Sequence, residues 1–347
     1  MKKDSSKSHK CKKHPFASHL VAYIRQLHVT DNYHGFLELL NHWFFITSAI
    51  FLSSMAWKYF STPGAALTYL LVLVHIGGRQ RSLADVLHQA SHLTLAKNRM
   101  LNNVLGTIFS GYFVFQSLTG YRATHGKGHH GHFGDPENDP DFKHLTEVGL
   151  CGVNRTPVAV IKFVIGLFSI SSIYKYLVYL TKNRIFPMEE SRAERTGRLL
   201  FYTSITVALI YYDLMFIFFF YWIIPLITTQ AWIGASAELS EHFPMIDCED
   251  RIDIITTRNR HCGNITNFIL GLRKAEGLHL VHHLFPGLPA WHAVKAHEVL
   301  MADPSYRSVN LAIGHGWKQI FLEIISAQTN LSEIYANSQI SDVDTMK

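Results

Sequence analysis

The sequence predicts an all-α integral membrane protein, with about four transmembrane helices in two hairpins and a cytoplasmic helical cap that carries clustered histidines. Three observations support this fold class. Hydrophobic residues make up 48% of the 347 residues and charged residues only 17%, which is an unusual balance for a soluble protein. Long apolar runs are separated by turn signals, and the histidine clusters all lie outside those runs.

Two apolar runs near the N-terminus predict the first transmembrane hairpin. A helix needs about 20 residues to cross a hydrocarbon core of about 30 Å. The run from Trp43 to Phe60 is followed by the turn signal STPG and then by a second run from Gly64 to Gly78. We therefore expect spans at about 43–60 and 64–78.

A second hairpin is predicted from the apolar run between Leu199 and Trp232. This run is too long for one crossing, and Asp213 interrupts it near the middle. We expect spans at about 199–213 and 214–232.

The remaining chain divides around these hairpins. We expect residues 1–42 to form a basic N-terminal tail with a short helix that leads into the first span. Residues 43–297 should form the membrane domain that carries the histidine clusters, and 298–347 a cytoplasmic C-terminal helix and polar tail. Two further apolar stretches, 104–118 and 158–180, are short or broken by polar residues. We expect them to lie at the membrane interface or beneath the cap.

Positive charge predicts the orientation in the membrane. The first thirteen residues carry six Lys and one Asp, which accounts for +5 of the net charge of +6. No Lys or Arg lies between Lys58 and Arg79, or between Arg198 and Arg251. Because Lys and Arg near spans stay on the cytoplasmic side, both hairpin turns should face outward, and both termini and the histidine clusters should face the cytoplasm. No basic stripe recurs along the chain, which argues against nucleic-acid binding.

Three clusters stand out among the 22 histidines. Spacings of three and four residues within them bring imidazoles to one side of a helix, as in sites where two histidines bind one metal. The clusters are His88 and His92 in DVLHQASH; His125, His129 and His130 in THGKGHHGH; and His279, His282 and His283 in GLHLVHHLFPG.

Eight imidazoles are too many for one ion. A structural zinc site takes four ligands, and a catalytic site takes three plus water, so the clusters predict two metals. Imidazole suits iron, copper, nickel and zinc alike, so the ligands alone leave the metal open.

The second cluster contains Gly126 and Gly128. Each glycine weakens a helix by about 1 kcal/mol, so we expect these histidines to lie on a loop. His132 falls beyond the helical neighbours of His125 and is the weaker candidate ligand.

The three clusters resemble the histidine boxes of the membrane fatty acid desaturase family, as do GDPENDPDF after the second cluster and HHLFPGLP in the third. The similarity extends from about Trp43 to about His297. It implies a di-iron enzyme that uses O2 and two electrons to attack an unactivated C–H bond on the cytoplasmic side. It also implies one further histidine ligand before the third box, for which we favour His242 in SAELSEHFP over His261 in RNRHCGN.

Residues near the boxes are candidates to orient the imidazoles through their second ring nitrogen. These are Asp85, Asp139, Glu241 and, if it is not a ligand, His261. The alternative for Asp139 is a turn and for Glu241 a helix end. No catalytic residue beyond the metal ligands is predicted.

The leading functional hypothesis is an O2-dependent di-iron desaturase that introduces a double bond into a long acyl chain of a lipid or thioester. Because no HPGG haem motif is present, electrons should come from a separate ferredoxin or cytochrome b5-type donor. A hydroxylase or ketolase of lipids or carotenoids on the same scaffold is the nearest alternative. A His-rich metal transporter is less favoured. It would place ionisable ligands inside the spans, and the only evident candidates, His75 and Asp213, each fall at an expected span end or turn.

Overall fold

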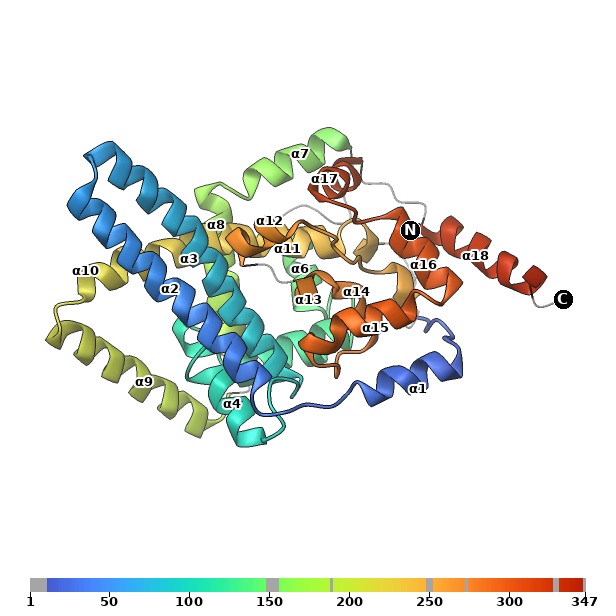
Figure 1. Cartoon of the computed structure of the whole chain (residues 1–347), viewed down its shortest axis with the longest axis horizontal. Coiled ribbons are helices and arrows are strands. Elements are labelled where there is room, and N and C mark those ends of the chain that lie inside the picture. The colour runs from blue at the N-terminus through green and yellow to red at the C-terminus, as the bar shows by residue number, and fades with distance from the viewer. Residues whose placement is uncertain are drawn as a thin grey trace.

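A computed structural model describes residues 11–147, 156–187, 190–247, 252–271, 274–326 and 331–345. The described residues form helices and two isolated β-bridges, without a strand among them. Figure 1 shows α2, α3 and α9 extending to one side of the molecule, while shorter helices and both ends of the chain gather on the other. The all-helical prediction is confirmed for this part of the chain.

The predicted first hairpin is present as α2 (His34–Tyr59) and α3 (Thr62–Ser91), which lie side by side (Figure 1). A proline in the first turn of α3 fits the helix start, where its missing N–H costs nothing. α3 continues well past Gly78, where the apolar run ends. The residues beyond that point are polar but buried, among them Arg79, Gln80 and Asp85, so hydropathy alone did not reveal that the helix carries on.

Glycines allow α3 to approach its neighbours closely. A Cβ on Gly77 would lie 2.1 Å from Oγ1 of Thr229, and a Cβ on Gly78 would lie 2.5 Å from the carbonyl carbon of Leu270. Small residues serve this purpose where membrane helices pack backbone to backbone. They hold α3 at the centre of the fold.

The predicted break at Asp213 is also present. α9 (Arg192–Tyr211) ends just before it, and Asp213 takes a left-handed φ of +54°. A second helical run then extends from Met215 to His242. It comprises α10 (Met215–Phe218), the π-helical segments η4 (Phe219–Ile223) and η5 (Leu226–Gln230), and α11 (Ala231–His242).

Within the described residues, two helices are long and apolar enough to cross a membrane, namely His34–Tyr59 and Met215–His242. α7 (Pro157–Gly166) and the run Ile170–Ile185, which joins α8 (Ile170–Leu180) to η3 (Thr181–Ile185), meet the criterion together but are bent by 73°. α3 and α9 do not meet the criterion. By this criterion alone, the part of the chain that the structure describes has two or up to three candidate spans, so four spans stays a prediction.

The stretch 104–118 does not form one helix. α4 (Arg99–Thr107) is followed by a short 3-10 turn, η1 (Gly111–Val114), and the left-handed Phe115 (φ +58°) then redirects the chain into α5 (Leu118–Tyr121). These elements pack against α3, under the cap side of the molecule.

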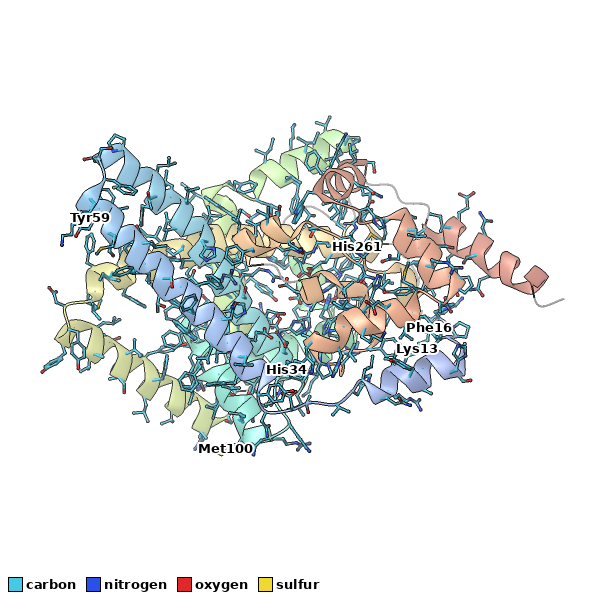
Figure 2. All side chains as sticks on the ribbon, in the orientation of Figure 1. Lys13, Phe16, His34, Tyr59, Met100 and His261 are labelled. Carbon is cyan, nitrogen blue, oxygen red and sulfur yellow. The ribbon has the colours of Figure 1, made fainter. Side chains whose placement is uncertain are left out.

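The cap is built from short helices around one apolar core that includes Ile254, Leu280 and Tyr306. Its N-terminal segment is held by His14, whose Nε2 lies 3.2 Å from Asp303 and whose Nδ1 lies 3.1 Å from the hydroxyl of Tyr335. Figure 2 shows Lys13 and Phe16 beside the C-terminal helices α16 (Pro304–Ala312) and α18 (Leu331–Thr345), far from Tyr59 at the tip of α2. The two terminal regions therefore pack together. The remaining helices are α1 (Ser18–Gln26), α6 (Pro140–Glu147), α12 (Asn264–Leu270), α13 (Lys274–Gly277), α14 (His279–Leu284), α15 (Ala293–Leu300) and α17 (Trp317–Ser326).

The C-terminal amphipathic helix was predicted, and α17 covers it. Most of the expected polar tail is also helical, because α18 extends to Thr345. Residues 1–10, which hold most of the basic tail, lie outside the described residues.

Candidate metal centre

Nine histidines from four elements converge on one region of the protein. The structure brings together all eight imidazoles of the three sequence clusters and adds His242. They come from α3 and its C-terminal cap (His88, His92), the π-helix η2 (His125, His129, His130), the end of α11 (His242) and α14 (His279, His282, His283).

Five of them form a first group, in which every ligand atom lies within 4.8 Å of every other: His88, His92, His125, His130 and His282. Nε2 of His282 lies 2.9 Å from Nε2 of His88 and 2.9 Å from Nε2 of His130. Two ligands at right angles around one ion, with bonds of about 2.1 Å, are about 3.0 Å apart. The first group therefore has the spacing of ligands around a single ion.

The other four form a second group. His129, His242 and His283 lie within 4.8 Å of one another, and Nε2 of His279 lies 3.0 Å from Nε2 of His242 and 3.1 Å from that of His283. Nε2 of His129 is buried and has no hydrogen-bond partner among the described residues. Such a nitrogen is costly to bury without a partner, and a cation beside it would supply one. The donor set thus fits a second ion.

The second box is helical, so the predicted loop is wrong. Residues Arg122–His130 form η2, a π-helix. Its wider turn brings residues five apart onto one face, and Nε2 of His125 lies 3.1 Å from Nε2 of His130. Gly128 is needed here, because a Cβ would lie 2.7 Å from Cδ of Pro140. The glycine permits close packing against the start of α6.

Three carboxylates face the outer ring nitrogens of three histidines, and all three were among the predicted orienting residues. Asp139 lies 3.1 Å from Nδ1 of His129, Asp85 lies 3.2 Å from Nδ1 of His88, and Glu241 lies 3.5 Å from Nδ1 of His279. Such partners fix the tautomer and leave Nε2 free for a metal. Asp85, Asp139 and Glu241 therefore stand where orienting residues would be required.

Sequence reasoning missed Asp141. Its Oδ2 lies 3.9 Å from Nδ1 of both His125 and His129, and its Oδ1 accepts a short hydrogen bond from the Tyr179 hydroxyl. The signal was the NDPD sequence, where we singled out only the first of the two neighbouring aspartates. The same turn places both Asp139 and Asp141 beside His129.

Asp139 is the best supported of these carboxylates. It is fully buried and accepts backbone hydrogen bonds from Gly134 (2.8 Å), Asp141 (3.0 Å) and Phe142 (3.1 Å). Burial acts to raise its pKa, but His129 and these N–H groups outweigh that effect and lower the pKa to about 2. For His129, burial acts to lower the pKa, while Asp139 outweighs it and raises the pKa to about 9.

Most of the other imidazoles are kept neutral. Burial, together with neighbouring histidines, holds the pKa values of His125, His130, His279, His282 and His283 well below their usual range. Metals bind the neutral form of imidazole. The protein therefore maintains these side chains in the state that a cation requires.

His261 does not join the cluster. Its Nε2 lies 3.0 Å from Oδ1 of Asn310, and its ring stacks on His315 with centroids 4.8 Å apart. Of the two candidates for the ninth histidine, the structure brings His242 into the centre. His132 also lies outside both groups, exposed to solvent, with Nδ1 3.0 Å from the backbone carbonyl of Lys127.

A cavity of about 240 Å³ adjoins the centre, and His88, His125, His242 and His282 are among its lining residues. One water needs only about 10–15 Å³, so the cavity can admit a ligand of several heavy atoms. Its wall is mixed in character. Phe163, Leu167 and Ile173 supply apolar surface, and the ion pairs Arg184–Asp141 and Arg81–Glu276 supply charge.

Comparison with known proteins agrees with this geometry. The profile of the family described as "Fatty acid desaturase" matches residues 61–314. The chain is 35% identical over 253 residues to dihydrorhizobitoxine desaturase of Bradyrhizobium elkanii, a match that covers 71% of each protein. It is 31% identical over 77 residues to the delta 8-(E)-sphingolipid desaturase of Komagataella phaffii, which covers 22% of this chain and 14% of that protein.

The family match spans all three histidine boxes and both carboxylates of the NDPD sequence. The structural arrangement and these relationships lead to one conclusion. The chain belongs to the fatty acid desaturase family and is an oxidoreductase of the desaturase type.

Proposed function

We propose that this protein is an O2-dependent di-iron desaturase that introduces a double bond into a long acyl chain of a lipid or thioester. The reaction converts CH2–CH2, O2, two electrons and two protons into CH=CH and two waters. Bound iron would supply the redox chemistry that activates O2 and removes hydrogen from an unactivated C–H bond. The observation that carries this proposal is the pair of imidazole groups beside one cavity, with Nε2 separations of 2.9–3.1 Å.

The protein's own residues have three tasks in this reaction. The nine imidazoles would hold the ions, and Asp85, Asp139 and Glu241 would keep the rings oriented. The cavity wall would place the chain, because a C–H bond without acidity reacts only where it is held close to the oxidant. Phe163, Leu167 and other apolar lining residues suit a hydrocarbon segment.

Electrons would come from a separate ferredoxin or cytochrome b5-type protein. The proposed topology has four spans in two hairpins, with both termini and the metal centre on the cytoplasmic side. The Lys-rich N-terminus and the lack of Lys and Arg from 59 to 78 and from 199 to 250 support that orientation.

The relatives differ in the substrates that their names give, so membership of the family leaves the substrate of this chain to experiment. Untargeted mass spectrometry of lipids and polar metabolites should compare cells that express the wild type with cells that express the double variant His282→Ala, His283→Ala. The matched control is His315→Ala, at an exposed histidine outside both groups.

We expect a product two hydrogens lighter than its precursor in wild-type and His315→Ala cells only. A product that has instead gained one oxygen atom would assign the chain to the hydroxylases or ketolases. Identical profiles in wild-type and double-variant cells, with both proteins present in the membrane, would contradict the proposed function.

A further inference from the structure

The two imidazole groups of the metal centre differ in size. The first group has five histidines, and the second has four, namely His129, His242, His279 and His283. If the two ions have similar coordination numbers, the second group lacks one ligand from the protein. A further protein ligand should therefore lie beside the second group.

Glu238 lies beside the second group. It precedes His242 by one turn of α11, so both side chains lie on the same face of the helix. Its Oε1 lies 3.5 Å from Nε2 of His242, the same nitrogen that faces His279 at 3.0 Å. Two ligands with bonds of about 2.1 Å to one ion are about 3.0 Å apart at right angles and about 3.4 Å apart at the tetrahedral angle. Glu238 is thus at the distance expected of a fellow ligand.

The surroundings of Oε1 also call for a cation. This atom is buried and has no hydrogen-bond partner among the described residues, while the rest of the side chain lies on the wall of the cavity. Leaving a buried polar atom without a partner costs roughly 1–3 kcal/mol, and more when it is charged. An ion bound at the second group would remove this cost.

The neighbouring carboxylate of Glu241 already has hydrogen-bond partners. Oε1 of Glu241 accepts hydrogen bonds from Nε (3.1 Å) and Nη2 (2.5 Å) of Arg260, and its Oε2 faces Nδ1 of His279. Glu241 therefore approaches an imidazole from its outer side. Glu238 instead directs Oε1 toward Nε2 of His242, the nitrogen that also faces His279.

We infer that Glu238 is the fifth protein ligand of the second ion. One ion would then have five nitrogen ligands, and the other four nitrogens and one carboxylate oxygen. This inference rests on the proposed di-iron function. It makes the two ions chemically distinct, because a carboxylate is an anionic oxygen ligand and imidazole is a neutral nitrogen ligand.

The test uses the full chain, purified in detergent, stripped of metal and titrated anaerobically with ferrous iron. Wild type is compared with Glu238→Ala, with Glu238→Asp, which shortens the carboxylate, and with Glu137→Gln, a control at an exposed carboxylate. Three quantities are measured: the iron bound per chain, the Mössbauer spectrum of the loaded protein, and the thermal midpoint of the metal-free protein.

We expect wild type and Glu137→Gln to bind two irons with distinct Mössbauer signals. Glu238→Ala should bind one of the two irons at least tenfold more weakly and alter one signal while the other persists, and Glu238→Asp should lie between. Metal-free Glu238→Ala should unfold no earlier than metal-free wild type, because the substitution removes a buried oxygen without a partner. A merely structural role for Glu238 would lower that midpoint.

Unchanged iron affinity and unchanged signals in Glu238→Ala would overturn the ligand assignment and leave the di-iron function standing. A lower midpoint in the metal-free variant together with normal iron binding would do the same. Wild-type protein that binds no iron would overturn both the assignment and the proposed function.

Discussion

His88 and His282 are 194 residues apart in the chain, yet their Nε2 atoms lie 2.9 Å apart inside the protein. One atom belongs to the long helix α3 and the other to the short helix α14 of the cap. A cation between them would join the two elements directly. Metal binding should therefore contribute to the stability of the folded protein as well as to its activity.

Removal of metal should thus lower the thermal midpoint. An ion that binds only the folded state stabilises it by about 2.7 kcal/mol when present at 100 times its Kd. For a chain of this size that corresponds to a fall of roughly 5 °C on chelation. Differential scanning fluorimetry measures the thermal midpoint of the purified protein before chelation, after chelation and after addition of ferrous iron. A midpoint that ignores both treatments would show that no metal links these elements.

Substitution of individual ligands should abolish the activity without loss of the protein from the membrane. His282→Ala and His129→Ala each remove an imidazole whose Nε2 faces the centre. We expect no detectable product from either variant and normal amounts in the membrane fraction. His132→Ala is the matched control, since this exposed histidine belongs to the same sequence cluster but to neither group. Full activity in His129→Ala would remove it from the ligand set.

Asp139→Asn should weaken iron binding. The substitution keeps the size of the side chain but removes the charge that orients His129 from 3.1 Å. Loss of such a partner lowers metal affinity about 10- to 100-fold. Iron titration measures the change, with Glu137→Gln on the same turn as the control. If affinity were unaltered, Asp139 would be a turn residue only, which is the alternative that the NDPD sequence allows.

Asp303 should make stability depend on pH. Burial acts to raise its pKa, but hydrogen bonds from His14 and from the N–H of Tyr306 outweigh burial and lower it below the usual 3.8. A carboxyl with a lowered pKa stabilises the fold above its unfolded pKa, and that stability is lost as pH falls through the lower folded value. Wild type should therefore lose this contribution below about pH 4.

Two variants separate the charge of Asp303 from its role as the N-cap of α16, where it accepts a hydrogen bond of 2.9 Å. Asp303→Ala should cost about 1 kcal/mol for the cap in addition to the loss of the His14 contact. Asp303→Asn should retain most of the cap. Thermal midpoints between pH 7 and pH 3 should converge with wild type at the acid end for Asp303→Asn. A constant difference across that range would contradict the assigned pKa shift.

Gly78→Ala should destabilise the fold by about 1–3 kcal/mol, because the new Cβ would meet the backbone of Leu270 at 2.5 Å. The control is Gly197→Ala in α9, where a Cβ has nothing within 4 Å. That variant should be neutral or more stable by up to about 1 kcal/mol, since alanine favours helix over glycine. Thermal midpoints in detergent compare them. Equal midpoints would show that α3 can move away from Leu270.

The sequence predicted the elements whose signal is periodic or compositional. The first hairpin, the break at Asp213 and the three histidine clusters belong to this class, and three carboxylates predicted to orient imidazoles lie beside them. The π-helical form of the second box was missed because its period of five residues resembles neither helix nor loop patterns. Asp141 and Glu238 were missed because only the fold shows which carboxylates of a polar stretch face the cluster.

The Asp141–Arg184 ion pair of 3.4 Å also limits how the chain can be threaded through a bilayer. The pair places Asp141, which precedes α7, beside Arg184, which follows α8. If the bent pair between them entered a bilayer, it would therefore enter and leave by one face. His130 and His242 meet in the same centre, which requires an even number of crossings between them. If the run Met215–His242 crosses, α9 must be its return passage. If α2 crosses a membrane, the same parity, applied to His14, Asp303 and His88, would make α3 its return passage.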